Sequence, residues 1–179
     1  IAAPMNEPEL RNMMYTALGS GHPFMIRYPR GHGEGLPWRG EKFEALPVGR
    51  GRRLREGDDV ALVSVGTVGN AAARAAERAA AEGVDAAHYD LRFVKPLDEA
   101  LLDEVGRKFR RVVTVEDGAL RGGVGEAVAA FFNDRGYDVR VHRLGIGDEW
   151  VEHGTPGQLY ALCGYDEEGI LRALLDTRA

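Results

Sequence analysis

The residues best suited to ligand chemistry are Arg27 and Arg30, at the end of a short apolar and aromatic run. That run, residues 24–28, lies between Gly-His-Pro and Pro29, a pattern that predicts a buried strand with an abrupt end. In parallel sheets, ligands bind at the carboxyl ends of strands. An arginine there suits a phosphate or a carboxylate, because its planar guanidinium donates two parallel hydrogen bonds. The alternative is that one arginine pairs with a nearby acid and the other is solvated.

Other candidate sites have simpler interpretations. The glycine-rich run 122–125 precedes a predicted helix, but Val128 stands where the dinucleotide fingerprint needs glycine, so a tight turn and close packing are expected. Glu116 and Asp117 point to opposite faces of a strand, so helix capping or an interface contact is expected rather than a shared proton. Cys163 has no neighbouring base in the sequence and is expected to be a buried thiol. The five histidines show no metal-ligand spacing, so residue chemistry alone supplies no complete active site.

Composition excludes several classes of function. The chain has 179 residues, of which 44% are hydrophobic and 28% charged, as in ordinary globular proteins. A net charge of −5 argues against a general nucleic-acid binder. The single cysteine excludes an internal disulfide and fits a reducing compartment such as the cytoplasm. No apolar run is long enough to span a membrane, and no signal peptide is evident. Because residues 1–4 look like the end of a strand, we expect the chain to be a piece of a longer protein.

The arginines must be positioned by the tail of an α/β unit. A strand end at residues 1–3, a helix at about 7–18 and the strand 24–28 make up this tail, and we expect it to pack separately or to be poorly ordered. Glycine and proline then punctuate residues 32–45, which predicts a linker. Strands are predicted at 60–65, 86–91, 112–115 and 139–144, alternating with helices at 69–81, 96–105, 124–132, 158–162 and 167–175. This alternation predicts an α/β fold, a mostly parallel sheet of about five strands with helices on both faces.

Several stretches resemble a known family. In chain order they are Ala2-Ala3-Pro4-Met5-Asn6-Glu7, Ile26-Arg27-Tyr28-Pro29-Arg30-Gly31, Asp90-Leu91-Arg92-Phe93-Val94-Lys95-Pro96-Leu97-Asp98, Val113-Thr114-Val115-Glu116-Asp117, Gly145-Ile146 and Glu152-His153-Gly154. Together they resemble the C-terminal part of the thiamine-diphosphate-dependent, transketolase-like enzymes, over essentially the whole chain. The resemblance implies that residues 1–31 end the aminopyrimidine-binding domain, 32–45 form a linker, and 46–179 form the C-terminal domain.

The run at residues 92–98 is typical of the synthases of this family that condense pyruvate with glyceraldehyde 3-phosphate and release carbon dioxide. By this resemblance Arg27 binds the phosphate of the acceptor substrate, and Arg30 is a second candidate. The family needs thiamine diphosphate and Mg²⁺, but its Gly-Asp-Gly…Asn magnesium motif and its activating glutamate do not occur in this sequence. The resemblance therefore implies cofactor-binding residues elsewhere in the enzyme, a chain that is inactive alone, and a homodimer.

Two alternatives remain open. The chain could be the β-subunit-like part of another transketolase-like enzyme, such as a 2-oxoacid dehydrogenase. It could also be an α/β binding or dimerisation module without chemistry. The Tyr-Pro-Arg-Gly segment and the Arg-Phe-Val-Lys-Pro-Leu-Asp run favour the synthase.

Overall fold

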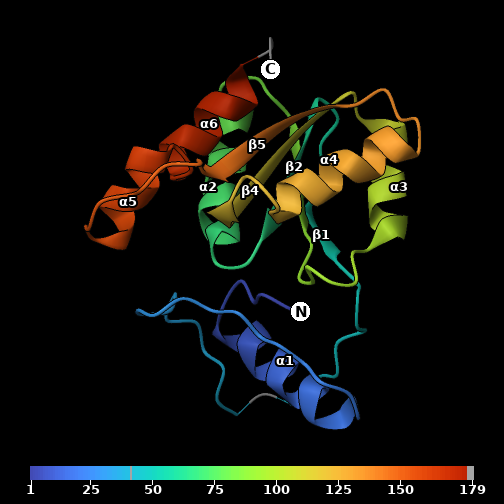
Figure 1. Ribbon diagram of the computed structural model, residues 1–179, viewed down its shortest axis with the longest axis vertical. Helices are drawn as coiled ribbons and strands as arrows, with labels where there is room; N and C mark the ends of the chain where they lie inside the picture. Colours follow the sequence, from blue (N-terminus) through green and yellow to red (C-terminus); the bar gives the residue numbers. More distant parts are fainter. Residues whose placement is uncertain (41, 177–179) are drawn as a thin grey trace.

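The computed structural model describes residues 1–40 and 42–176, which form two parts of unequal size (Figure 1). The larger part is built on one sheet in the order β1-β3-β2-β4-β5. Strands β2 to β5 pair in parallel, and β1 pairs antiparallel with β3 at one edge. The strands are β1 (Arg52–Arg55), β2 (Val60–Val65), β3 (Ala86–Asp90), β4 (Arg111–Ala119) and β5 (Arg140–Ile146).

Helices cover both faces of this sheet. One face packs against α2 (Val68–Ala81) and α6 (Glu167–Leu175), and the other against α3 (Glu99–Lys108) and α4 (Val124–Asp134). A further helix, α5 (Pro156–Cys163), projects beside α6 and has no buried residue (Figure 1). The predicted α/β fold, with a mostly parallel five-stranded sheet and helices on both faces, is confirmed.

The central strands form because both of their faces are covered. All six residues of β2 are buried, as expected for an apolar run inside a parallel sheet. Strand β1 was not predicted, because its sequence, Arg-Arg-Leu-Arg, has no apolar run. As an edge strand it needs only one neighbour, and its arginines reach solvent and nearby acids.

The smaller part holds α1 (Glu7–Gly19), which lies apart from the sheet (Figure 1). The Asn6 side chain accepts a hydrogen bond from the Glu9 amide and so caps this helix. The predicted buried strand at residues 24–28 is wrong. Ile26 makes one isolated parallel bridge to Ala2, and Arg27 is exposed. Among the described residues no second strand pairs with the other side of this segment. Its apolar side chains Phe24 and Ile26 are therefore only partly buried.

The first 31 residues belong to the smaller part and are attached to the larger part by backbone hydrogen bonds. The Ala3 amide donates to the Arg92 carbonyl oxygen at 2.9 Å, and the Val94 amide donates to the Ile1 carbonyl oxygen at 2.9 Å. A small apolar cluster packs at this joint between residues 1–3 and 92–94. Its buried members are Ala2, Met13, Leu46 and Phe93.

The described residues of the segment 32–45 lie in no helix or strand. None of the helices in the described ranges is both long and apolar enough to cross a membrane.

Candidate functional site

Arg27 reaches from the smaller part to the end of β4. Its Nη2 donates to the Asp117 carbonyl oxygen and lies 3.9 Å from Asp117 Oδ2. The Arg27 side chain is still 56% exposed. One nitrogen of the guanidinium is therefore fixed by the protein, while the group as a whole remains accessible to a ligand.

Two tyrosines hold the Asp117 carboxylate from the other side. Tyr165 donates its hydroxyl to Oδ1 at 2.9 Å, and Tyr160 donates to Oδ2 at 3.2 Å. Burial, reinforced by the negative charge of Asp117, raises the pKa of both phenols. Both hydroxyls therefore stay protonated at neutral pH and act as donors. Asp117 thus contacts Arg27 of the smaller part as well as two tyrosines, partners that the sequence could not name.

Glu116 points to the opposite face and has a structural role. Its buried carboxylate accepts the backbone amides of Val124 at 2.9 Å and Gly125 at 2.8 Å, the first residues of α4. Helix capping is thereby confirmed for Glu116. A Cβ added at Gly125 would lie 2.5 Å from Thr114 Oγ1, so the close packing expected of the glycine-rich turn is also confirmed.

Arg30 lies in a different environment from Arg27. It lines a cavity of about 520 Å³ between residues 28–34 and the N-terminal end of α2. His32 and Arg74 line the same cavity, whereas Arg27 does not. The two arginines are linked only indirectly, because Tyr160 lines the cavity and also donates to Asp117.

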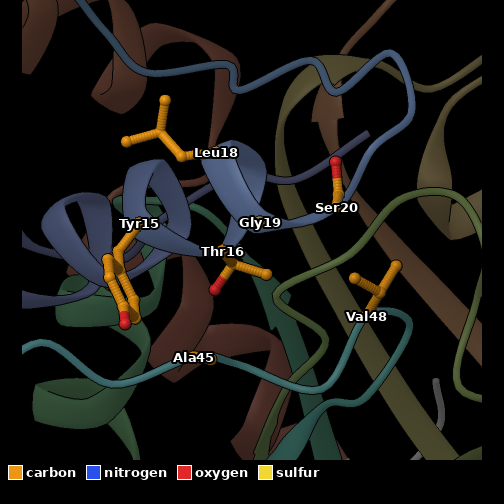
Figure 2. A pocket seen from close by; sticks show the side chains of 7 residues that line it. All are labelled: Tyr15, Thr16, Leu18, Gly19, Ser20, Ala45 and Val48. Atoms are coloured by element: carbon orange, nitrogen blue, oxygen red, sulfur yellow. The ribbon is translucent and has the colours of Figure 1, made fainter.

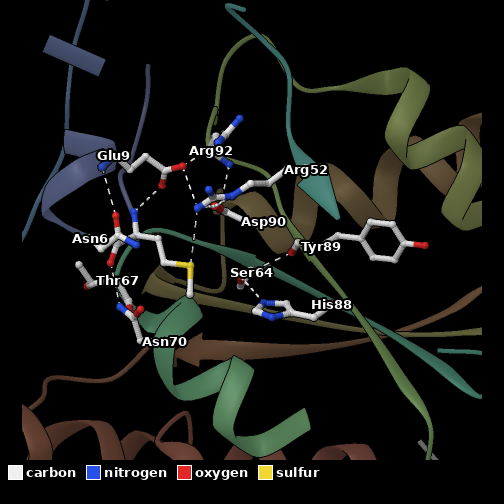
Figure 3. A network of polar contacts seen from close by, with 11 residues as sticks. Asn6, Glu9, Arg52, Ser64, Thr67, Asn70, His88, Tyr89, Asp90 and Arg92 are labelled. Carbon is white, nitrogen blue, oxygen red and sulfur yellow. Dashed lines mark hydrogen bonds and ion pairs between the residues drawn. The ribbon is translucent and has the colours of Figure 1, made fainter. Parts of the chain in front are cut away.

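A buried polar network joins the two parts beside this site (Figure 3). Glu9, which is 4% exposed, accepts from Arg92 Nε at 2.7 Å and pairs with Arg52 Nη2 at 2.9 Å. Arg52 also binds Asp90 Oδ2 at 3.1 Å. Burial and the neighbouring charge of Glu9 raise the pKa of Asp90 to about 6, although Arg52 opposes this shift. No local pattern of residues indicated this network, because its members come from three separate segments.

A second cavity, of about 550 Å³, lies between the C-terminal end of α1 and residues 45–48 (Figure 2). Apart from the Tyr15 phenol, its lining contains no acid, base or thiol. The lining residues are Tyr15, Thr16, Leu18, Gly19, Ser20, Ala45 and Val48. The polar side chains of this cavity are therefore hydroxyls alone, from Tyr15, Thr16 and Ser20.

The described residues contain no assembled cluster of metal ligands. In residues 1–40 and 42–176, no group of three or more His, Cys, Asp or Glu side chains could hold a metal ion. The amides of Val124 and Gly125, which could have bound a phosphate, are occupied by Glu116. Cys163 is only half-buried against the core around α2 and α6, which corrects the expectation of a buried thiol.

The larger part, an α/β domain with an antiparallel edge strand that is joined through residues 92–94 to the smaller part, has the architecture of a C-terminal domain of the transketolase type. The chain belongs to the family described as "Transketolase, C-terminal domain", which matches residues 49–170. The predicted resemblance to transketolase-like enzymes is thereby confirmed.

Curated relatives are 1-deoxy-D-xylulose-5-phosphate synthases. The chain is 53% identical to that of Bacteroides fragilis over 99% of this chain and 28% of the relative. It is 43% identical to that of Symbiobacterium thermophilum over 95% of this chain and 26% of the relative. A solved structure titled "Split gene transketolase, inactive beta4 tetramer" matches with a TM-score of 0.84 and 30% identity, covering 97% of this chain and 55% of that one. The chain therefore spans less than a third of the length of these synthases.

Proposed function

We propose that this chain is the C-terminal part of a thiamine-diphosphate-dependent transferase that makes 1-deoxy-D-xylulose 5-phosphate. Such an enzyme condenses pyruvate with glyceraldehyde 3-phosphate, releases carbon dioxide and supplies precursors of isoprenoids, thiamine and pyridoxal. Support comes from the 53% identity to a curated synthase along nearly the whole chain. The similarity to relatives that share this name favours the synthase over a 2-oxoacid dehydrogenase subunit or a module without chemistry.

In this proposal the chain supplies acceptor binding and not the cofactor site. Thiamine diphosphate and Mg²⁺ are held by the remaining part of the same enzyme, because the family's Gly-Asp-Gly…Asn motif and activating glutamate do not occur in this sequence. The enzyme is a cytoplasmic homodimer, and this chain alone is inactive. The boundaries at residues 31 and 46 separate the end of the aminopyrimidine-binding domain, the linker and the C-terminal domain.

Arg27 binds the phosphate of glyceraldehyde 3-phosphate in this proposal. The observation that carries this assignment is the half-exposed guanidinium, fixed through one nitrogen at the carboxyl end of β4. A phosphate dianion there receives charge-assisted hydrogen bonds from a group that is already positioned. Arg30 remains a second candidate, because it lines a cavity together with His32 and Arg74, although the acids Glu7 and Glu34 line the same cavity.

The test is steady-state kinetics of the full-length enzyme with each substrate varied in turn. Arg27→Ala should raise the KM for glyceraldehyde 3-phosphate by roughly tenfold to a hundredfold, because a lost charged hydrogen bond costs about 1.5–3 kcal/mol. Arg27→Lys should recover only part of the loss, because a lysine lacks the planar fork. The KM for pyruvate should change much less, since pyruvate has no phosphate.

Arg30→Ala should show the same selectivity only if Arg30 also faces the acceptor. Arg121→Ala serves as a control, because this exposed arginine pairs with Asp148 at 3.0 Å on a different loop. Unchanged kinetics for the phosphorylated substrate in Arg27→Ala would refute the assignment of this arginine.

A further inference from the structure

We propose that Asp117 positions Arg27 for the acceptor phosphate. In this proposal Tyr160 and Tyr165 hold the Asp117 carboxylate so that it does not form a bidentate ion pair with the arginine and leaves the guanidinium free to bind phosphate. This inference rests on the proposed function of Arg27. It adds three residues of the C-terminal domain to a site whose ligand-binding arginine lies in the other part of the chain.

The need for positioning follows from where Arg27 lies. Its backbone is fixed on one side by a single bridge, in which the Arg27 amide donates to the Ala2 carbonyl oxygen at 2.8 Å. An arginine side chain has several rotatable bonds, and freezing them on ligand binding weakens affinity. The contact of Nη2 with the Asp117 carbonyl oxygen freezes part of that freedom before the ligand arrives.

The carboxylate of Asp117 could compete with a phosphate for the same guanidinium. Its nearer oxygen, Oδ2, stays 3.9 Å from Arg27 Nη2, longer than a hydrogen bond. The hydroxyls of Tyr160 and Tyr165 each donate to one of the two carboxylate oxygens, at 3.2 and 2.9 Å. The tyrosines thus hold the carboxylate close enough to attract Arg27, but turned away from a bidentate pair with it.

The three supporting groups come from separate elements. Asp117 belongs to β4, Tyr160 to α5, and Tyr165 to the turn between α5 and α6. Tyr165 is 2% exposed and its ring lies 5.0 Å from that of Tyr160, so the pair is supported by packing. The projecting helix α5 therefore supplies Tyr160 to the acceptor site, although none of its residues is buried.

The experiment measures the kinetics of full-length Tyr165→Phe, Tyr160→Phe and Asp117→Asn enzymes. Each should raise the KM for glyceraldehyde 3-phosphate by roughly threefold to tenfold, the range for one supporting hydrogen bond or partly exposed ion pair. The value of kcat and the KM for pyruvate should change less than twofold. Unphosphorylated glyceraldehyde, used as the acceptor, should react equally well with the parent and the variants, which a general structural defect would not allow.

A second measurement asks whether the effect passes through Arg27. In an Arg27→Ala background, Tyr165→Phe and Asp117→Asn should cause no further rise in the KM for the phosphorylated acceptor. Tyr137→Phe is the matched control, since Tyr137 donates to Asp103 Oδ1 at 2.8 Å in a comparable pair far from the site. It should leave the acceptor KM unchanged.

The outcomes separate the two proposals. If Arg27→Ala raises the acceptor KM but the tyrosine and aspartate variants do not, the positioning role is overturned and the proposed function stands. If those variants act equally with and without Arg27, the positioning role is overturned as well. If Arg27→Ala itself has no effect, both proposals fail. Should Asp117→Asn not fold, Tyr160→Phe decides the matter, because this side chain is only half-buried and loses one hydroxyl.

Discussion

His88 and Asp90 allow a quantitative test of the buried polar region on β3. Burial, with a smaller contribution from the positive charge of Arg52, lowers the pKa of His88 from 6.5 to about 4. Burial and the charge of Glu9 raise the pKa of Asp90 from 3.8 to about 6, against the opposing effect of Arg52. Both shifts favour the neutral form, but they affect stability in opposite directions as the pH changes.

The signs follow from which state binds more protons. Between pH 4 and 6 the folded chain holds the Asp90 proton and the unfolded chain has lost it, so this contribution to stability falls as pH rises. Between pH 4 and 6.5 the unfolded chain protonates His88 and the folded chain does not, so this contribution rises with pH. Near pH 5 each group contributes a slope of about 1.2 kcal/mol per pH unit, and the two slopes nearly cancel.

Two substitutions should each remove one of these opposing pH dependences and leave the other measurable. Relative to the parent chain, the free energy of unfolding of His88→Gln should decrease by about 1.2 kcal/mol per unit as pH rises from 4.5 to 5.5. Asp90→Asn should show the opposite trend, so each variant controls for the other. Urea unfolding at three pH values across this interval measures both trends. Parallel pH profiles for the parent and both variants would show that neither pKa is shifted as described.

Two further predictions concern packing and charge. Glu9→Gln should lower the free energy of unfolding by about 2–3 kcal/mol, below the usual cost of breaking a buried ion pair because its arginines keep some exposure. Urea unfolding beside the exposed control Glu82→Gln checks this, and equal stability of the two variants would count against it. Gly125→Ala should cost about 1–3 kcal/mol, because its Cβ would lie 2.5 Å from Thr114 Oγ1. The control Gly157→Ala, at a position where nothing lies within 4 Å of the added Cβ, should leave the thermal unfolding midpoint unchanged or raise it. A similar loss of stability in Gly125→Ala and Gly157→Ala would contradict the prediction.

The sheet could be predicted where burial alone shapes the sequence. Strands β2 and β4 are covered on both faces, so β2 and residues 112–115 of β4 read as mostly apolar runs. The prediction failed at β1 and at residues 24–28, whereas the other edge strand, β5, was predicted at 139–144. Strand β1 is rich in arginine because it forms an edge, and residues 24–28 look like a buried strand but make a single bridge. Periodicity reports the burial of side chains and does not say how many neighbouring strands are present.

The candidate site was less accessible to such reasoning, because its contacts connect distant residues. Arg27 and Asp117 are 90 positions apart, and no local pattern could pair them. Glu116 was easier, since a carboxylate shortly before a glycine-rich helix start is a natural cap. The run 92–98 was recognised only as a family signature. Its physical roles appear in the structure, where Phe93 packs at the joint and Asp98 caps α3 by accepting the Leu101 amide at 3.1 Å.

The joint and the candidate site are mechanically connected. Ala2 bridges to Ile26 on one side and to Phe93 on the other, so the backbone that carries Arg27 is held against residues 92–94. The guanidinium of the same arginine is held by Asp117. The larger part therefore restrains Arg27 in two ways, indirectly through the Ala2 backbone and directly through the contact of the guanidinium with Asp117. Under the proposed function, a substitution at Phe93 should consequently raise the KM for the phosphorylated acceptor in kinetics of the full-length enzyme, as well as weaken the attachment of the two parts.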